Sequence, residues 1–232
     1  ETITVVYTAT LNKDAVIGMN PNTNKAVVEY SNDPKSNGTG TSEPSIVDAH
    51  TFDFTIYKYY LKDQNNKDDK TALANAEFEL YKANAAGDAA DTNAKINIVK
   101  VKDGEYRQAT PEEAAAGGFK SDVIVSGTDG KVLVKGLDAG TYYLRETKAP
   151  EGYNKLFSDI KVEIKATYGT DGKLASYRVD YTYNGNTTTG SEITNKTDSP
   201  EVAVENKTGA QLPSTGSKGA LMVTLAGIVL FG

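Results

Sequence analysis

The sequence of 232 residues contains no cysteine and no tryptophan, and its only histidine is His50. Without cysteine no disulfide can form, so an extracellular protein of this composition needs another way to lock its fold. One histidine and no cysteine argue against a zinc site or a histidine-based catalytic triad. The net charge of −6 argues against nucleic acid or an anionic membrane surface as a partner.

One acidic stretch could suggest calcium but lacks the usual pattern. Residues 62–70, KDQNNKDDK, are rich in acidic and amide side chains. They lack the glycine and the spaced terminal glutamate of an EF-hand loop. We therefore predict a solvated hairpin loop there, and neither a metal site nor a cofactor in the chain.

Most of the chain alternates between apolar and polar residues in short stretches that end in turn residues. A period of two is typical of strands that turn one face toward a core. Only 38% of the residues are hydrophobic, as expected when the other face meets solvent. The Asn184-Gly185 pair is a strong hairpin signal. The sequence therefore predicts an all-β fold, a β-sandwich of short strands.

Three predicted strands each place one polar residue on an otherwise apolar face. Lys58 lies in residues 51–61 near the start of this region, Glu146 in a middle strand, and Asn206 in the last strand. Side chains two apart in a strand share a face. The apolar residues on these three faces are Phe52, Phe54, Ile56, Tyr142, Leu144, Val202 and Val204.

A lysine, a glutamate and an asparagine buried together have a specific chemistry. Desolvation lowers the pKa of an amine and raises that of a carboxylic acid, so burial favours both neutral forms. A neutral amine is a nucleophile, and a protonated carboxyl can polarise an amide carbonyl and pass a proton to leaving ammonia. The pattern predicts an isopeptide bond between Lys58 and Asn206, with Glu146 as the catalytic residue. The bond would form once, without a cofactor.

Each of the three residues also has a simpler explanation. A polar residue at an inward position is often at a strand end that meets solvent, and a lysine can extend along its stem to water. For one residue alone this explanation is favoured. Three complementary types on the first, a middle and the last strand favour the bond.

Two segments carry a resemblance to a known family. Residues 142–154, YYLRETKAPEGYN, resemble the E-box of Gram-positive pilins and related surface proteins, whose CnaB-type immunoglobulin-like domains contain such a bond. Residues 73–81, LANAEFELY, resemble another part of these domains, although Asn75 stands where the family often has glycine. The family pattern has lysine in the first strand, glutamate in the E-box and asparagine in the last strand. The resemblance places Lys58, Glu146 and Asn206 in these roles.

Residues 1–49 are expected to be the last strands and linker of a truncated preceding β-domain. Residues 1–11 alternate as a strand, 24–30 read as a second strand, and the Pro, Gly and Ser content of 32–47 predicts an irregular loop. This part resembles the end of the middle domain of streptococcal-type backbone pilins. By that resemblance Asn24 is the candidate acceptor of a second isopeptide bond, and a place in the turn before the strand explains Asn24 equally well.

Residues 83–120 are longer than a minimal domain of this kind needs. Residues 83–94 read as a loop of small residues, and 96–101 as a short strand. Residues 111–118, PEEAAAGG, predict a short helical turn, because they begin with Pro111 at a first helical position, continue with two glutamates and end with glycines. An elaborated loop is the favoured interpretation, and a binding role stays open.

The end of the chain carries its most specific motif. Leu212, Pro213, Ser214, Thr215 and Gly216 form LPSTG, which is followed by an apolar run at 220–231. This arrangement resembles the LPxTG cell-wall sorting signal, in which a sortase cleaves after the threonine and joins its carbonyl to an amine. The apolar run has about a dozen residues, short of the roughly 20 that cross a bilayer, and is interpreted as a truncated membrane segment.

The sequence as a whole predicts a C-terminal part of a sortase-assembled backbone pilin. The expected divisions are a truncated β-domain (1–49), a CnaB-type domain (50–208), the sorting signal with its tether (209–219) and the membrane segment (220–232). The expected partners are a sortase, neighbouring pilin subunits and the peptidoglycan cross-bridge, at the cell surface. The subunit-joining lysine is expected upstream.

Two other classes of function stay open at this point. One is a wall-anchored adhesin that binds a host matrix protein, which a groove or an exposed aromatic patch in residues 83–120 would favour. The other is the stalk of a surface hydrolase. Apart from the single-turnover set of Lys58, Glu146 and Asn206, no group of residues supports catalysis, so we expect no enzyme.

Overall fold

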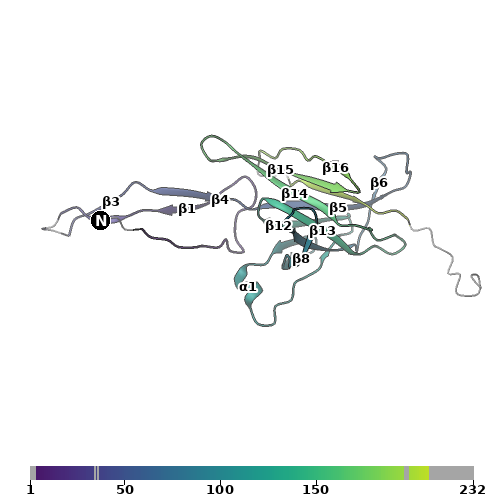
Figure 1. Cartoon of the computed structure of the whole chain (residues 1–232), viewed down its shortest axis with the longest axis horizontal. Helices are drawn as coiled ribbons and strands as arrows, with labels where there is room; N and C mark the ends of the chain where they lie inside the picture. Colours follow the sequence, from purple (N-terminus) through teal and green to yellow (C-terminus); the bar gives the residue numbers. More distant parts are fainter. Residues whose placement is uncertain (1–3, 34, 36, 196–198, 209–232) are drawn as a thin grey trace, which may run out of the picture.

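The computed structural model describes residues 4–33, 35, 37–195 and 199–208. Two β-sheets pack face to face in the main body, and an extended N-terminal part projects from it (Figure 1). The predicted all-β, immunoglobulin-like sandwich is confirmed. Within the described residues, no helix is long and apolar enough to cross a membrane.

The first sheet has six strands and contains both ends of the domain. Its order is β17 (Glu201–Glu205), β5 (Phe52–Leu61), β12 (Lys131–Leu137), β10 (Glu105–Gln108) and β9 (Ile98–Lys102), with β6 (Lys70–Ala72) also paired to β5. The turn between β5 and β6 is exposed, as predicted for residues 62–70. β17 runs parallel to β5, with Val204 opposite Lys58.

The second sheet has seven strands and carries Glu146. Its order is β11 (Ile124–Val125), β7 (Glu77–Ala83), β13 (Gly140–Lys148), β14 (Ile160–Tyr168), β15 (Leu174–Tyr183) and β16 (Asn186–Thr188), with β8 (Ala90–Lys95) also paired to β7. The hairpin between β15 and β16 turns at Asn184 and Gly185, both with positive φ, as the sequence predicts.

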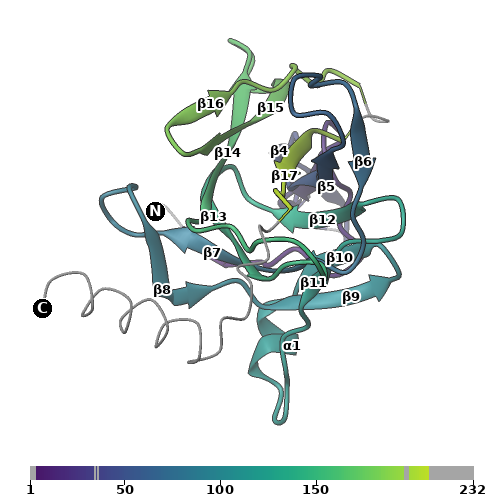
Figure 2. The same ribbon diagram turned by 90° about the vertical axis from the view of Figure 1, so that its right-hand side faces the viewer.

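The hydrophobic core lies between the two sheets, which face each other in Figure 2. Alternation along β5 holds as predicted from Phe52 to Lys58, where inward residues are buried and outward residues are partly exposed. Tyr60 has the inward parity but is partly exposed, as are its neighbours at the end of the strand. The buried apolar side chains of this core include Phe54, Ile56, Tyr142, Leu144, Val202 and Val204 on the strands that carry or precede the three polar candidates, and Phe78 and Leu80 on β7.

Asn75 shows why the family pattern has glycine at its position. The residue adopts a φ of 64°, a conformation that glycine adopts freely and asparagine tolerates. Its main-chain N–H donates to the carbonyl of Ser126 at 3.0 Å. The departure from the family pattern is therefore conformationally conservative.

The N-terminal part differs from the prediction because strand pairing overrides local composition. Residues 4–11 form no strand, and Val5 and Val6 are 81% and 85% exposed. The predicted strand at 24–30 is split into β1 (Asn22–Ala26) and β2 (Glu29–Ser31), because its partner changes from β4 (Ser45–Ala49) to β3 (Thr39–Thr41). These two partners lie in the stretch predicted to be an irregular loop, and that prediction was wrong.

The insertion at 83–120 is more ordered than predicted. The stretch predicted to be a loop contains β8, which pairs with β7 and so extends the second sheet. The predicted helical turn is confirmed as α1 (Pro111–Ala115), with Thr110 and Glu113 forming a capping box. Tyr143 points away from the core as its parity predicts, yet it is buried, and its hydroxyl donates to the carbonyl of Gly87 at 3.0 Å.

The turn before β12 supports β5 at Lys58 and generates a prediction. Gly130 has a φ of 74°, and a Cβ there would lie 2.4 Å from the main-chain oxygen of Lys58. Gly104 has the same φ but open space around it. We expect Gly104→Ala to lower the free energy of unfolding by about 1 kcal/mol through backbone strain alone, and Gly130→Ala by roughly 2 kcal/mol more. Urea unfolding checks this, and equal losses would contradict it.

Candidate functional site

Lys58 is held by its main chain on β5, an interior strand of the first sheet between β17 and β12. Its N–H donates to the carbonyl of Gly130 at 2.8 Å, and its carbonyl accepts from Leu73 N at 2.9 Å. Asn206 follows β17 directly, and its N–H donates to the carbonyl of Tyr59 at 2.9 Å. The parallel pairing of β17 with β5 therefore puts Lys58 and Asn206 on the same inward face.

The structure brings the three predicted site residues together. Lys58 Nζ lies 3.0 Å from Glu146 Oε1, and both side chains are completely buried. Asn206 Nδ2 donates to the same carboxylate, at 3.2 Å from Oε1 and 3.4 Å from Oε2. Glu146 comes from β13 of the opposite sheet, so the carboxylate crosses the core to reach the other two groups.

Apolar side chains and two main-chain groups surround these residues. The Phe78 ring has its centroid 5.7 Å from Lys58 Nζ. The N–H of Leu156 donates to Glu146 Oε2 at 2.7 Å, and the carbonyl of Asn154 accepts from Asn206 Nδ2 at 3.0 Å. These main-chain partners carry no side-chain signal in the sequence, and only their place after the turn at Pro150 and Gly152 points to them.

Burial shifts the ionisation of the lysine. Removal from water lowers the pKa of Lys58 from 10.5 to about 8, and the neighbouring Glu146 carboxylate offsets part of this effect. The amine is therefore much closer to its neutral, nucleophilic form at neutral pH than an exposed lysine is.

The amide of Asn206 faces the site with its nitrogen. Asn206 Oδ1 is buried and has no hydrogen-bond partner among the described residues. Lys58 Nζ has its ionic contact with Glu146 but no hydrogen bond of good geometry. In this arrangement the Glu146 carboxyl contacts the amide nitrogen of Asn206, whereas the sequence-based mechanism had it polarise the carbonyl oxygen.

The other candidate residues lie elsewhere. Asn24 is exposed on β1, and its Nδ2 donates to the Tyr7 hydroxyl at 2.6 Å. Leu212, Pro213, Ser214, Thr215 and Gly216 lie outside the described residues. Within the described part of the chain, no group of three or more potential ligands could hold a metal ion.

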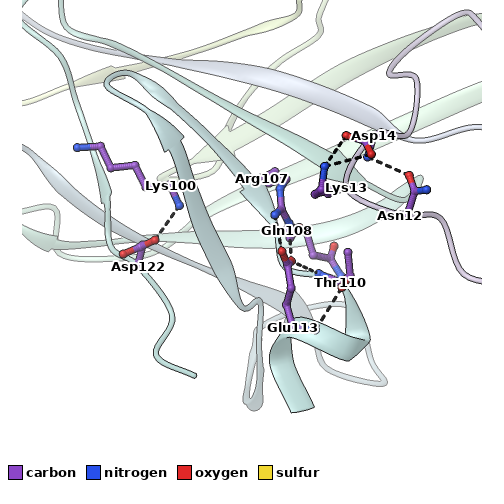
Figure 3. A network of polar contacts seen from close by, with 9 residues as sticks. All are labelled: Asn12, Lys13, Asp14, Lys100, Arg107, Gln108, Thr110, Glu113 and Asp122. Carbon is purple, nitrogen blue, oxygen red and sulfur yellow. Dashed lines mark hydrogen bonds and ion pairs between the residues drawn. The ribbon is translucent and has the colours of Figure 1, made fainter. Parts of the chain in front are cut away.

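A second polar cluster lies in the insertion, beside the N-terminal part. Arg107 makes two hydrogen bonds of 2.6 Å with the Glu113 carboxylate, which also accepts from Thr110 N at 2.9 Å (Figure 3). The turn with Lys13 and Asp14 lies beside it, and Arg107 lowers the pKa of Glu113 to about 2. These contacts hold α1 against β10 within the insertion.

A comparison with protein families identifies the domain. The model of the SpaA family, described as a prealbumin-like fold domain, matches residues 59–175, just over half of the chain. The chain belongs to this family. The matched part of the SpaA domain includes Glu146, whereas Lys58 lies one residue before it and Asn206 lies after it. No curated protein matches the sequence.

Several solved structures are similar to parts of this chain. They include the pilus 2b backbone protein of group B streptococcus (25% identity, 76% of this chain and 49% of that chain, TM-score 0.41). Others are the major pilin subunit BcpA of Bacillus cereus (19%, 85% and 41%, 0.41) and the shaft pilin SpaA of Lactobacillus rhamnosus GG (19%, 73% and 50%, 0.37). The present chain spans about half of their length. All three TM-scores are below 0.5, so the family assignment depends on the domain match.

The ionisation of Lys58 can be measured in a chain that cannot form the bond. In Asn206→Ala, we expect the 13Cε resonance of Lys58 to titrate near pH 8, because burial lowers its pKa. The unfolded chain keeps this proton up to about pH 10.5, so the variant's free energy of unfolding should rise with pH between these values. Adding Glu146→Gln should lower the pKa further, since the attractive charge is lost. A midpoint near 10.5 in Asn206→Ala would contradict the effect of burial.

Proposed function

We propose that the chain is part of a structural pilus subunit, whose SpaA domain is locked by an isopeptide bond between Lys58 and Asn206. The observation that supports the bond most directly is that a buried amine and a buried amide contact the same oxygen of a buried carboxylate. Lys58 Nζ and Asn206 Nδ2 lie 3.0 and 3.2 Å from Glu146 Oε1. A buried ion pair of this kind is weak evidence for stability alone, but it is the arrangement that amide transfer requires.

The proposed reaction conserves its protons within the site. Lys58 passes a proton to Glu146, and the neutral Nζ attacks Cγ of Asn206. As the bond between Cγ and Nδ2 breaks, Glu146 gives its proton to Nδ2. The second proton lost by Nζ returns to the carboxylate. Ammonia leaves, the new amide carries one N–H, and Glu146 ends as a neutral carboxylic acid.

The bond would reinforce the domain at its two ends. It would close a loop of about 150 residues, and a cross-link of that span adds roughly 4–5 kcal/mol by the loop-closure argument. It would also join β5 to the end of β17, so a pull on the chain ends would load a covalent bond instead of the hydrogen bonds of the sheet. A surface protein without cysteine gains from this bond what a disulfide supplies elsewhere.

The sorting motif supports attachment at the cell surface. Thr215 of LPSTG would be acylated by a sortase and joined to an amine of a neighbouring subunit or of the peptidoglycan cross-bridge. The proposed domain limits stay at 50–208, with the tether and sorting signal at 209–219 and the membrane segment at 220–232. Asn24 stays a proposed acceptor for a second bond with a lysine outside this sequence.

The adhesin alternative receives less support. The hollow of about 780 Å³ beside the turn between β9 and β10 is lined by one aromatic residue, Tyr106, whose ring is buried in the core. The residues that line this hollow therefore form no exposed aromatic patch that could bind a host matrix protein. A structural role is the better proposal.

The bond itself is tested by intact mass. We expect the folded full-length chain to be one ammonia lighter than its sequence, because the reaction expels Asn206 Nδ2. Glu146→Ala should retain the full mass, since no group remains to transfer the proton. Tandem mass spectrometry should find Lys58 and Asn206 in one branched peptide. Glu163→Ala, which removes a surface carboxylate of β14, should still lose ammonia.

Two results would contradict this proposal. A folded chain with the full sequence mass would mean that the three groups do not react. A chain that loses ammonia equally well with Glu146→Ala would mean that the carboxylate is not the proton carrier.

The attachment is tested separately by transpeptidation. We expect a sortase that recognises LPxTG, together with triglycine, to release residues 216–232 and to leave triglycine on Thr215. Thr215→Ala should block this, because the cleaved bond follows the threonine. Unchanged processing of Thr215→Ala, or none of the parent chain, would contradict the sorting role and leave the isopeptide proposal untouched.

A further inference from the structure

A short main-chain segment closes the site from the side of the second sheet. Residues 153–156, here called the capping segment, follow the turn at Pro150 and contact two of the three reacting residues. The segment adds no acid, base or nucleophile to the site. It acts through its main-chain groups, which contact residues of the isopeptide reaction proposed above.

The N–H of Leu156 distinguishes the two oxygens of Glu146. It donates to Oε2 at 2.7 Å. Oε1 is the oxygen nearer to Asn206 Nδ2, at 3.2 Å, and it lies 3.0 Å from Lys58 Nζ. A carboxylate fixed in this way receives and returns a proton at one oxygen, which faces both the nucleophile and the leaving group.

The carbonyl of Asn154 fixes the orientation of the reacting amide. It accepts from Asn206 Nδ2 at 3.0 Å. A carbonyl can only accept, so the Asn206 amide must present its NH₂ group and not its oxygen to this position. The leaving nitrogen is thereby kept beside Glu146, and Asn206 Oδ1 is left without a partner among the described residues.

The capping segment is itself held by the strands that it helps to align. Asn154 N donates to the carbonyl of Lys207 at 3.1 Å, and Tyr153 forms a bridge with Thr208, just after Asn206. The Tyr153 ring packs on Tyr60 of β5, with centroids 5.2 Å apart. The segment is therefore anchored to the chain that follows β17 and to β5, and it reaches its position only when both have docked.

We propose that the main-chain groups of Asn154 and Leu156 position the Asn206 amide and the Glu146 carboxyl for bond formation. This inference depends on the proposed isopeptide bond. Removal of the N–H of Leu156 leaves all three reacting side chains in place and frees the carboxylate to rotate. A hydrogen bond to a charged group contributes about 1.5–3 kcal/mol, so its loss should slow bond formation about 10- to 100-fold.

The test compares proline at two nearby positions. Leu156→Pro removes the donor to Glu146. Glu151→Pro introduces the same ring before the capping segment, at an exposed position in the turn in which Tyr153 N donates to the carbonyl of Pro150. Proline suits this second turn position, because the next residue, Gly152, has a φ of 84°. Full-length chains are isolated unreacted in denaturant and refolded by dilution, and mass spectrometry follows the loss of ammonia with time. Circular dichroism and urea unfolding of each variant in the Asn206→Ala background report folding independently of the bond.

The expected result is a 10- to 100-fold slower loss of ammonia in Leu156→Pro and a rate within about threefold of the parent in Glu151→Pro. If Leu156→Pro does not fold, leucic acid at position 156, introduced by cell-free translation, deletes the N–H alone and decides the question. Equal rates in parent and Leu156 variants would overturn the positioning role while the bond stands. A parent chain that loses no ammonia would instead overturn the bond itself.

Discussion

The buried contact between Lys58 and Glu146 is the constraint on which the rest of the site depends. Two opposite charges in an apolar core lose more hydration than their attraction returns unless other polar groups complete the arrangement. Here the N–H of Leu156 and the amide of Asn206 complete it from the carboxylate side. In the proposed reaction both charges disappear, because the products are an amide and a neutral acid. The unfavourable burial of charge would then be a property of the precursor that the finished domain no longer has.

The parallel pairing of β5 with β17 is what makes this chemistry geometrically possible. The first and last strands of the domain are neighbours in one sheet, with Val204 opposite Lys58. Asn206 therefore reaches the lysine only when two ends of a long stretch of chain have come together, and β13 brings Glu146 from the other sheet. Parallel pairing of distant strands is slow to form because it closes a long loop. The proposed bond would therefore form late in folding.

The period-two pattern was enough to predict the burial of Lys58, Glu146 and Asn206, because each shares its strand face with large apolar residues. The same reasoning failed at residues 32–47 and 83–94, where β3, β4 and β8 form in stretches rich in small and polar residues. Those strands exist because a partner strand satisfies their main chain, and a partner distant in sequence leaves no local signal. The groups of Asn154 and Leu156 were missed for a related reason, since every residue has a main-chain N–H or carbonyl. The orientation of the Asn206 amide depends on these main-chain groups, so it could not be predicted from the sequence either.

The two-stranded ladders at the N-terminal end have a mechanical consequence. β1 pairs only with β4, and β2 only with β3, so each ladder in the described chain lacks a further strand on either side. If an isopeptide bond closes the loop between Lys58 and Asn206, a pulling force cannot extend the main body. Any lengthening of the described chain would then occur outside this loop. The bond would thus decide where a pulled chain begins to extend as well as how firmly the domain resists.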